Sequence, residues 1–244
     1  MSDNLSNAKD AGTAETVVAR RSSHCYAPFY ESGGITIYHA DCRELIDSIP
    51  WDVFVTDPPY GVALGKTNGS GGKHGLVRQG YTMLTDDFSE WAELVPPVMH
   101  AMAAKAKRGA AFTGPHLQEQ PKAEAIGGVY CPSGAGRHRW GFKTFLPVLF
   151  YGQAPNLQNG AKPNTIQSTA TADKCGHPCP KPLAWMQWLV GLVAEETDVI
   201  LDPFMGSGTT LVAAKLEGRR AVGIEIEERY CEIAAKRLAQ AALP

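Results

Sequence analysis

The chain is organised around the stretch Val53-Phe54-Val55-Thr56-Asp57-Pro58-Pro59-Tyr60-Gly61. A short apolar run rich in β-branched residues predicts a buried strand, and an acid followed by two prolines ends it. Proline has no N–H for the sheet ladder, so the strand stops where Asp57 begins. Pro58 and Pro59 fix two successive φ angles, which holds the Asp57 carboxylate, the Pro58 carbonyl and the Tyr60 ring in one rigid turn. Such a turn lies at the carboxyl end of a strand, where open α/β sheets bind their ligands.

Composition sets the outer limits. The chain has 244 residues, 44% hydrophobic and 20% charged, enough to bury a full core. Its apolar runs are far shorter than the ~20 residues that span a bilayer. The amino terminus is polar and has no hydrophobic signal segment. We therefore expect a cytoplasmic protein.

Six cysteines are scattered along the chain, as is usual for a protein from a reducing compartment. The segment Cys175-Gly-His177-Pro-Cys179 has a spacing that zinc sites use. No second pair of ligands stands at metal-binding spacing, so we expect no metal.

Basic residues gather in two segments although the net charge is −2. Residues 61–80 carry Lys66, Lys73, Arg78 and a histidine, with no acid. Residues 122–181 carry seven Lys or Arg against two acids, a local charge of +5. This distribution favours a basic groove for phosphates, although a solvated basic surface would give the same pattern.

The order of apolar patterns predicts an α/β chain. Residues 1–23 have the composition of a disordered tail, and we expect 24–244 to form one domain. Within it we expect a catalytic half at about 35–151, a short polar loop at about 152–176 and a cofactor half at about 177–244. Strands are predicted at 26–30, 35–39, 53–56, 110–113, 145–151, 199–201 and 221–226. Helices are predicted at 43–48, 87–107, 181–193, 209–216 and 228–242, with a kink or break at Pro96-Pro97.

Residues 61–80 read as a glycine-rich loop. A structureless loop of this length inside a compact domain is usually functional or disordered. Glycine would let the loop close over a ligand, and its cations favour a ligand that carries phosphate. A plain linker is the alternative.

A second constellation is the stretch Val199-Ile-Leu-Asp202-Pro-Phe-Met-Gly206-Ser-Gly208-Thr-Thr210. It predicts a strand, a glycine turn and the amino terminus of a helix, where a backbone can approach a ligand closely. It has no Gly-Lys-Ser/Thr ending, so it is not a phosphate-binding P-loop. Roughly 20 residues on, Glu225 ends the next strand, and an acid at that offset can bind ribose hydroxyls. Together these features predict a site for a nucleoside-type cofactor.

The cofactor half lacks one strand. A nucleotide-binding βαβαβ unit needs a third strand, but the chain ends one helix after Glu225. The run 35–39 can supply that strand, and Asp41 at its end is placed to meet the base of the cofactor. The domain is therefore predicted to be circularly permuted, with its catalytic half first.

These motifs resemble those of the permuted, β-class amino-methyltransferases of DNA, of the Asp-Pro-Pro-Tyr type. The order is Asp41, then Asp57-Pro-Pro-Tyr60, then His177-Pro-Cys-Pro-Lys181-Pro182, then Asp202 to Thr210, then Glu225. The match covers roughly 35–61 and 177–240. It implies a Rossmann-like fold with a single mixed sheet and helices on both faces. It also implies an S-adenosylmethionine-dependent methyltransferase, encoded by a bacterium or a phage.

The resemblance also implies site residues. The catalytic residues would be Asp57, Pro58, Pro59 and Tyr60: the carboxylate and the Pro58 carbonyl accept the N–H groups of the target amine, and Tyr60 stacks on a flipped base. No cysteine nucleophile is expected. The cofactor residues would be Asp41, Cys42, Asp57, Lys181, Asp202, Pro203, Phe204, Gly206, Ser207, Gly208, Thr209, Thr210 and Glu225.

Asp before Pro-Pro-Tyr favours adenine N6 as the target within this family, whereas Ser there more often accompanies cytosine N4. The expected function is therefore methylation of adenine N6 at a specific DNA site, as in restriction–modification. Cytosine N4 chemistry on the same scaffold stays an alternative. A non-catalytic DNA-binding or cofactor-sensing protein and an enzyme acting on RNA are others.

The chain departs from the family at about 152–176, the short loop where the resemblance places target recognition. About 25 polar residues there are too few to build a packed recognition unit. We therefore expect a short target, or recognition by other segments and by a second subunit in a homodimer. The residues expected to contact DNA are Lys66, Lys73, Arg78, Arg137 and Arg139.

Overall fold

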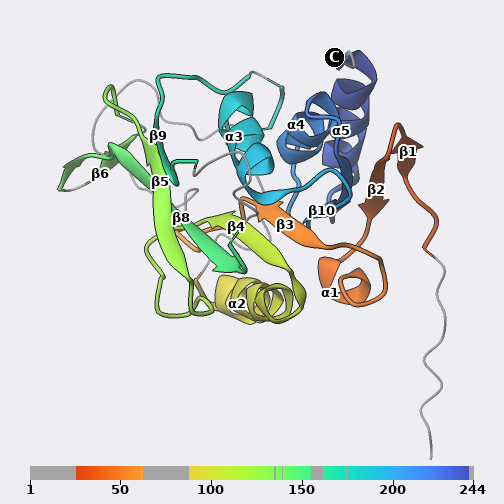
Figure 1. Cartoon of the computed structure of the whole chain (residues 1–244), viewed down its shortest axis with the longest axis horizontal. Coiled ribbons are helices and arrows are strands. Elements are labelled where there is room, and N and C mark those ends of the chain that lie inside the picture. The colour runs from red at the N-terminus through yellow and green to blue at the C-terminus, as the bar shows by residue number, and fades with distance from the viewer. Residues whose placement is uncertain are drawn as a thin grey trace, which may run out of the picture.

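A computed structural model describes residues 26–62, 88–134, 136–138, 140–154, 162–173, 175–177 and 179–241. These residues form a nine-stranded mixed sheet in the order β1-β2-β11-β10-β3-β4-β8-β5-β9, with β6 and β7 as a separate hairpin (Figure 1). The strands are β1 (Tyr30–Ser32), β2 (Ile35–His39), β3 (Val53–Thr56), β4 (Arg108–Phe112), β5 (Ala125–Tyr130), β6 (Arg137–His138), β7 (Gly141–Phe142), β8 (Phe145–Gly152), β9 (Thr165–Gln167), β10 (Val199–Asp202) and β11 (Arg220–Glu225). The helices are α1 (Cys42–Leu45), α2 (Phe88–Lys105), α3 (Leu183–Val193), α4 (Thr209–Leu216) and α5 (Glu228–Gln240).

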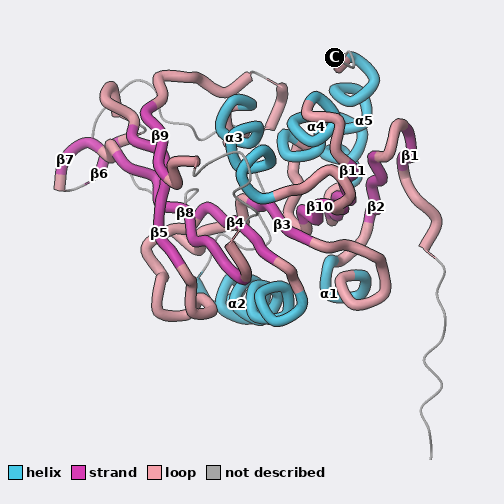
Figure 2. The backbone as a smooth tube through the Cα atoms, viewed as in Figure 1, coloured by secondary structure: helices cyan, strands magenta, loops and turns pink. Residues whose placement is uncertain are grey.

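Helices cover both faces of the sheet, as Figure 2 shows, with α3, α4 and α5 on one side and α1 and α2 on the other. Alternation along β3 explains the two layers, because successive side chains of a strand point to opposite faces. Val53 and Val55 pack in the cluster that contains Leu189 of α3, whereas Phe54 packs in the cluster with Met99 of α2. The sheet is thereby buried on both sides, as parallel sheets usually are.

The strand order confirms the predicted permutation. Strands β2, β11, β10, β3 and β4 lie side by side and are all parallel. The last two strands of the chain are thus inserted between β2 and β3, near its beginning. All five strands end at the same edge of the sheet, which brings together residues that lie up to 184 positions apart, from Asp41 to Glu225.

Most predicted elements are present, with shifted ends. The first strand is β1, which begins at Tyr30 rather than at residue 26. It pairs with β2 through a tight turn at Gly33 and Gly34, which both have positive φ angles. Helix α2 continues through Pro96 and Pro97, so of the predicted kink or break the break is wrong. Packing of Val95, Val98 and Met99 against the sheet outweighs the local cost of the prolines.

The sequence interpretation missed strands after β4. It placed no element at residues 114–139, where β5 pairs with β8, and it assigned a loop to 152–176, where β9 pairs with β5. Two adjacent glycines weaken the strand pattern of β5 in the sequence. The strand pairing requires a glycine at 127, because a Cβ there would lie 1.8 Å from the Asn164 carbonyl oxygen. The predicted tail and most of the glycine-rich loop lie outside the described residues.

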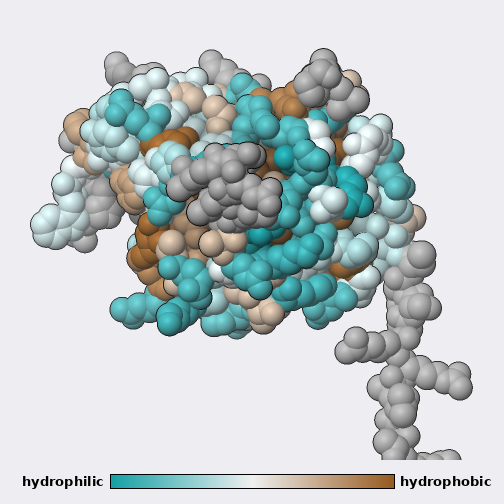
Figure 3. Space-filling model, viewed as in Figure 1, coloured by the Kyte–Doolittle hydropathy of each residue, from teal (hydrophilic) through white to brown (hydrophobic). Residues whose placement is uncertain are grey.

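The surface in Figure 3 is mostly hydrophilic over α1 and α2, and brown patches lie beside β5 and β8. Exposed apolar side chains of those strands include Ile126, Tyr130 and Phe145. Among the helices that the structure describes, none combines the length and the apolar character that a membrane crossing requires.

Candidate active site

A cleft of about 1430 Å³ opens at the carboxyl edge of the parallel strands. The ends of β2, β3, β10 and β11 reach it, together with the start of α3 and the β6–β7 hairpin. Its lining includes all four predicted catalytic residues and every predicted cofactor residue except Gly208. The permuted chain therefore gathers both motif sets in one place.

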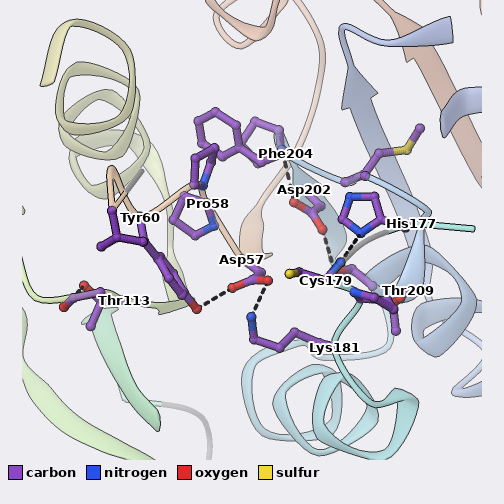
Figure 4. A pocket seen from close by; sticks show the side chains of 18 of the residues that line it. Asp57, Pro58, Tyr60, Thr113, His177, Cys179, Lys181, Asp202, Phe204 and Thr209 are labelled. Atoms are coloured by element: carbon purple, nitrogen blue, oxygen red, sulfur yellow. Dashed lines mark hydrogen bonds and ion pairs between the residues drawn. The ribbon is translucent and has the colours of Figure 1, made fainter. Parts of the chain in front are cut away.

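Asp57 lies at the centre of the cleft and has a partner on each carboxylate oxygen (Figure 4). The Tyr60 hydroxyl donates to Oδ1 at 2.7 Å, and the Lys181 ammonium lies 2.5 Å from Oδ2. Lys181, predicted to serve the cofactor, forms an ion pair with Asp57 in the structure, and its predicted role stays a prediction. A carboxylate has about four lone-pair positions, so Asp57 can still accept an N–H from a ligand.

The Asp57-to-Gly61 turn is clamped from outside. The Trp91 indole donates a hydrogen bond of 2.8 Å to the Pro59 carbonyl oxygen. Gly61 has a φ of +63°, and a Cβ there would lie 2.8 Å from the same indole. Gly114 packs equally closely, since a Cβ on it would lie 2.9 Å from Tyr60 Cβ. The rigidity expected from the two prolines is therefore reinforced by α2 and by the segment after β4.

Two lysine side chains lie near the Tyr60 ring. Lys181 Nζ and Lys143 Nζ lie 5.2 and 5.7 Å from its centroid. Burial, followed by the Asp57 charge, raises the pKa of Tyr60 well above its usual value, so the phenol stays neutral. Burial and the nearby Lys181 lower the pKa of Lys143.

The glycine turn and Glu225 form a single unit. Gly206 and Gly208 have φ angles of +51° and +76°, which favour glycine. The Gly206 N–H donates to Glu225 Oε2 at 3.0 Å, and the Glu227 N–H donates to Oε1 at 2.9 Å. Burial raises the pKa of the Glu225 carboxyl. The carboxylate is thus fixed at the cleft wall with further lone pairs free to accept hydroxyls.

The Asp202 carboxylate is buried and hydrogen-bonded to neighbouring elements. Its side chain is 2% exposed and accepts hydrogen bonds from the Thr56 hydroxyl at 2.7 Å, the Phe204 N–H at 3.2 Å and the Thr210 hydroxyl. Burial raises its pKa to about 6. Asp202 therefore ties β10 to β3 and to the start of α4.

Asp41 and Cys42 occupy the other end of the cleft. Asp41 caps α1 by accepting the Arg43 N–H at 2.9 Å, and it forms an ion pair with the Arg43 side chain. That arginine lowers the pKa of the Asp41 carboxyl. Burial raises the pKa of the Cys42 thiol to about 12, so it stays protonated.

The DNA-binding prediction falls largely outside the described residues. This is so for Lys66, Lys73, Arg78 and Arg139. The backbone of Arg137 forms part of β6, but its side chain is outside the described set. The expectation for these five residues stays a prediction.

Several residues of the cleft were not singled out in the sequence, although His177 stood in a quoted motif. The His177 ring lies edge-on to Tyr230, with centroids 4.7 Å apart, and burial lowers its pKa to about 4. Trp140, Phe142 and Lys143 also reach the cleft, from a hairpin that carries no motif. Across the part of the chain that the structure describes, no three His, Cys, Asp or Glu side chains are grouped to hold a metal ion.

Comparison with known proteins finds one matching family model and several related proteins. The family model described as DNA methylase, for the N6 and N4 enzymes, matches residues 115–236, which is half of the chain. Type II methyltransferase M.ScaI from Streptomyces caespitosus is 26% identical over 272 residues, covering 86% of this chain and 83% of that protein.

Solved structures show the same fold. The M1.HpyAVI–SAM complex has a TM-score of 0.58 at 24% identity and covers 84% of this chain and 98% of its own. The PvuII DNA methyltransferase, titled cytosine-N4-specific, has a TM-score of 0.61 at 17% identity and covers 86% of this chain and 88% of its own. The fold is therefore that of the S-adenosylmethionine-dependent DNA methyltransferases, as the motif order predicted.

Proposed function

This chain belongs to the DNA methylase family of N6 and N4 enzymes, and on that premise we propose that it transfers a methyl group from S-adenosylmethionine to the N6 amine of a flipped adenine in DNA. The observation that carries the proposal is the shared cleft. Asp57, Pro58 and Tyr60 line it together with Gly206 and Glu225. A catalytic turn and a nucleoside site thus face the same volume.

The lining fits S-adenosylmethionine. Glu225 and Asp41 present carboxylates at the ends of adjacent strands, suited to ribose hydroxyls and to the amine of an adenine base. Phe204 adds an apolar wall. Gly206 carries no side chain into this wall of the cleft. A Cβ at that position would lie 3.0 Å from His177 Nε2 and would crowd the ring. At about 1430 Å³ the cleft exceeds the roughly 300–1,000 Å³ of a usual ligand site, which leaves room for a base beside the cofactor.

The bound cofactor supplies an electrophilic methyl group on a sulfonium. The amine of the base is conjugated with its ring and is a poor nucleophile, so the protein has to orient its lone pair. The Asp57 carboxylate and the Pro58 carbonyl each accept one N–H, which directs the lone pair at the methyl carbon. As the N–C bond forms and the S–C bond breaks, the nitrogen becomes cationic. Asp57 is placed to stabilise that charge and to take the proton that the nitrogen then loses.

The base has to leave the duplex to reach Asp57, because its amine is otherwise held within the base stack. Tyr60 is neutral and rigidly held, which suits it to stack on the flipped base. Its ring is fixed by the hydrogen bond to Asp57 and by the packing of Gly114. This preorganisation lowers the ordering cost of binding.

Asp rather than Ser before Pro-Pro-Tyr supports adenine as the target base. The fold itself does not discriminate, since PvuII methyltransferase is titled cytosine-N4-specific and shares it. Both amines offer two N–H groups and one lone pair to the same acceptors. Cytosine N4 is therefore the second candidate.

The deciding experiment is nucleoside mass spectrometry on mixed-sequence duplex DNA incubated with the protein and S-adenosylmethionine. We expect N6-methyladenine. A peak of N4-methylcytosine would overturn the base assignment but keep the reaction, and the absence of both products would overturn the reaction on duplex DNA.

A matched pair of variants tests the role of Asp57. Asp57→Ala should abolish methyl transfer while S-adenosylmethionine, followed by calorimetry, binds within a few-fold of the wild-type affinity. Asp47→Ala removes an exposed acid outside the cleft lining and should be neutral. If both variants methylate equally, Asp57 has no catalytic role.

A further inference from the structure

Two strongly exposed aromatic side chains belong to the β6–β7 hairpin. Trp140 is 92% exposed and Phe142 is 75% exposed, the highest values among the large hydrophobic side chains that the structure describes. The hairpin projects from the end of the sheet at which β5 and β9 lie (Figure 1). Single exposed aromatics are ordinary, but two of them on one projecting hairpin indicate a binding surface.

The hairpin is attached directly to the catalytic cleft. Trp140, Phe142 and Lys143 all line the cleft that contains Asp57 and Tyr60. The Lys143 N–H donates to the Gly136 carbonyl oxygen at 2.9 Å, which closes the base of the hairpin. The half-buried Lys143 side chain turns inward, with Nζ 5.7 Å from the Tyr60 ring centroid. The exposed aromatics are therefore held at the mouth of the site, next to a residue that contacts Tyr60.

The charge of the surrounding sequence favours a nucleic acid as the ligand. The 48 residues between Glu124 and Asp173 contain no acid, and they carry Arg137, Arg139, Lys143 and Lys162. A basic segment with interleaved aromatics is suited to phosphates and bases together.

We propose, given the DNA methyltransferase function above, that Trp140 enters the base stack of the duplex and fills the space that the flipped target base leaves. Phe142, two residues further on, lines the same cleft. Flipping costs the stacking and pairing of one base, and an inserted aromatic ring replaces part of that loss. Trp140 would thus stabilise the flipped state without touching the reacting atoms.

The test compares Trp140→Ala with Trp140→Phe. Each variant methylates two duplexes that carry the mapped target site, one correctly paired and one mismatched at the target base. Stacking of one base on an aromatic ring corresponds to about tenfold or more in affinity. We therefore expect kcat/KM of Trp140→Ala to fall about tenfold or more on the paired duplex and less than about threefold on the mismatched one. Trp140→Phe should recover much of the loss.

The matched control is Ile126→Ala. Ile126 is 62% exposed on β5 and lies outside the cleft lining, so this variant should behave as wild type on both duplexes. Affinity for S-adenosylmethionine should be unchanged in all three variants. In a duplex with 2-aminopurine at the target, Trp140→Ala should also give a smaller fluorescence rise.

Three results would overturn the proposal. Equal losses on paired and mismatched duplexes would show that Trp140 contributes binding without helping the base to flip. A change of oligomeric state in Trp140→Ala would assign the hairpin to a protein interface. If wild-type protein methylates neither duplex, the function itself fails and the inserted tryptophan fails with it. In the first two cases the methyltransferase function stands.

Discussion

Lys181 and Asp57 form an ion pair across the cleft, with Nζ 2.5 Å from Oδ2 and both side chains largely shielded from water. The two residues are 124 positions apart in the chain, one just before α3 and the other at the end of β3. The pair therefore joins the two parts of the chain that the sequence predicts to be the cofactor half and the catalytic half. Lys181 Nζ also lies 5.2 Å from the centroid of the Phe112 ring, so the ammonium is held between two aromatic rings and the acid.

Replacing Lys181 by Met should weaken catalysis more than cofactor binding. A hydrogen bond to a charged group contributes about 1.5–3 kcal/mol, so we expect kcat to fall by roughly ten- to a hundredfold. Lys181→Arg retains the charge and should recover part of the rate. Steady-state kinetics give kcat, and calorimetry gives the affinity for S-adenosylmethionine. Equal losses in both would instead place Lys181 in the cofactor site, as its sequence motif implied.

Two of the confirmed predictions rest on local chemistry. The stop of a strand at Asp57 and the glycine turn before Thr209 follow from proline and glycine chemistry within a few residues, and the structure confirms both elements. The permuted strand order could also be predicted, because the predicted cofactor half contains one strand fewer than a nucleotide-binding unit needs. The Lys181–Asp57 pair depends on how two distant segments meet, and no local pattern encodes that.

Strands near the end of the sheet escaped prediction for a different reason. The sequence of β5 contains two adjacent glycines, which lower the strand signal. Only the approach of Asn164 explains why Gly127 has to be small. The β6–β7 hairpin is two residues long on each side, too short for a periodic pattern. Tertiary contacts, rather than propensity, define these elements.

Thr56→Val should destabilise the protein. The hydroxyl donates to the buried Asp202 carboxylate at 2.7 Å, and its loss leaves a buried charge with one partner fewer. We expect the free energy of unfolding to fall by about 1–3 kcal/mol, measured by urea denaturation. Thr165→Val on β9 is the control, because that hydroxyl is exposed, and it should change stability by less than about 0.5 kcal/mol. Similar losses in both variants would contradict the role of the Thr56 hydrogen bond.

Two glycine-to-alanine changes should have opposite effects. A Cβ at Gly109 of β4 would lie 2.2 Å from the Phe54 ring, so Gly109→Ala overpacks the core and should cost about 1–3 kcal/mol. Gly191 lies inside α3, and a Cβ there would meet nothing within 4 Å. Gly191→Ala should therefore stabilise the protein by about 0.5–1 kcal/mol, because alanine favours the helix. Thermal unfolding of both variants measures the two shifts, and a stable Gly109→Ala would show that Phe54 can move aside.

His177 should make stability depend on pH between about 4 and 6.5. Burial against Tyr230 lowers the pKa of this imidazole to about 4. The nearby Asp57 charge opposes the shift, and the charges of Lys181, Arg229 and Arg237 add to it. In this window the unfolded chain binds a proton that the folded chain does not, so the contribution of His177 is present above pH 6.5 and is lost as the pH falls toward 4. His177→Gln has no such titration.

The variant should consequently lose less stability than wild type on acidification, measured as urea midpoints at pH 7, 6, 5 and 4. Asp202 acts in the opposite sense, because its pKa is raised to about 6 and the folded protein binds its proton first as the pH falls. That contribution is common to both proteins and cancels in the difference between them. Parallel pH profiles would mean that the protonated His177 ring is tolerated in the fold, against the burial that surrounds it.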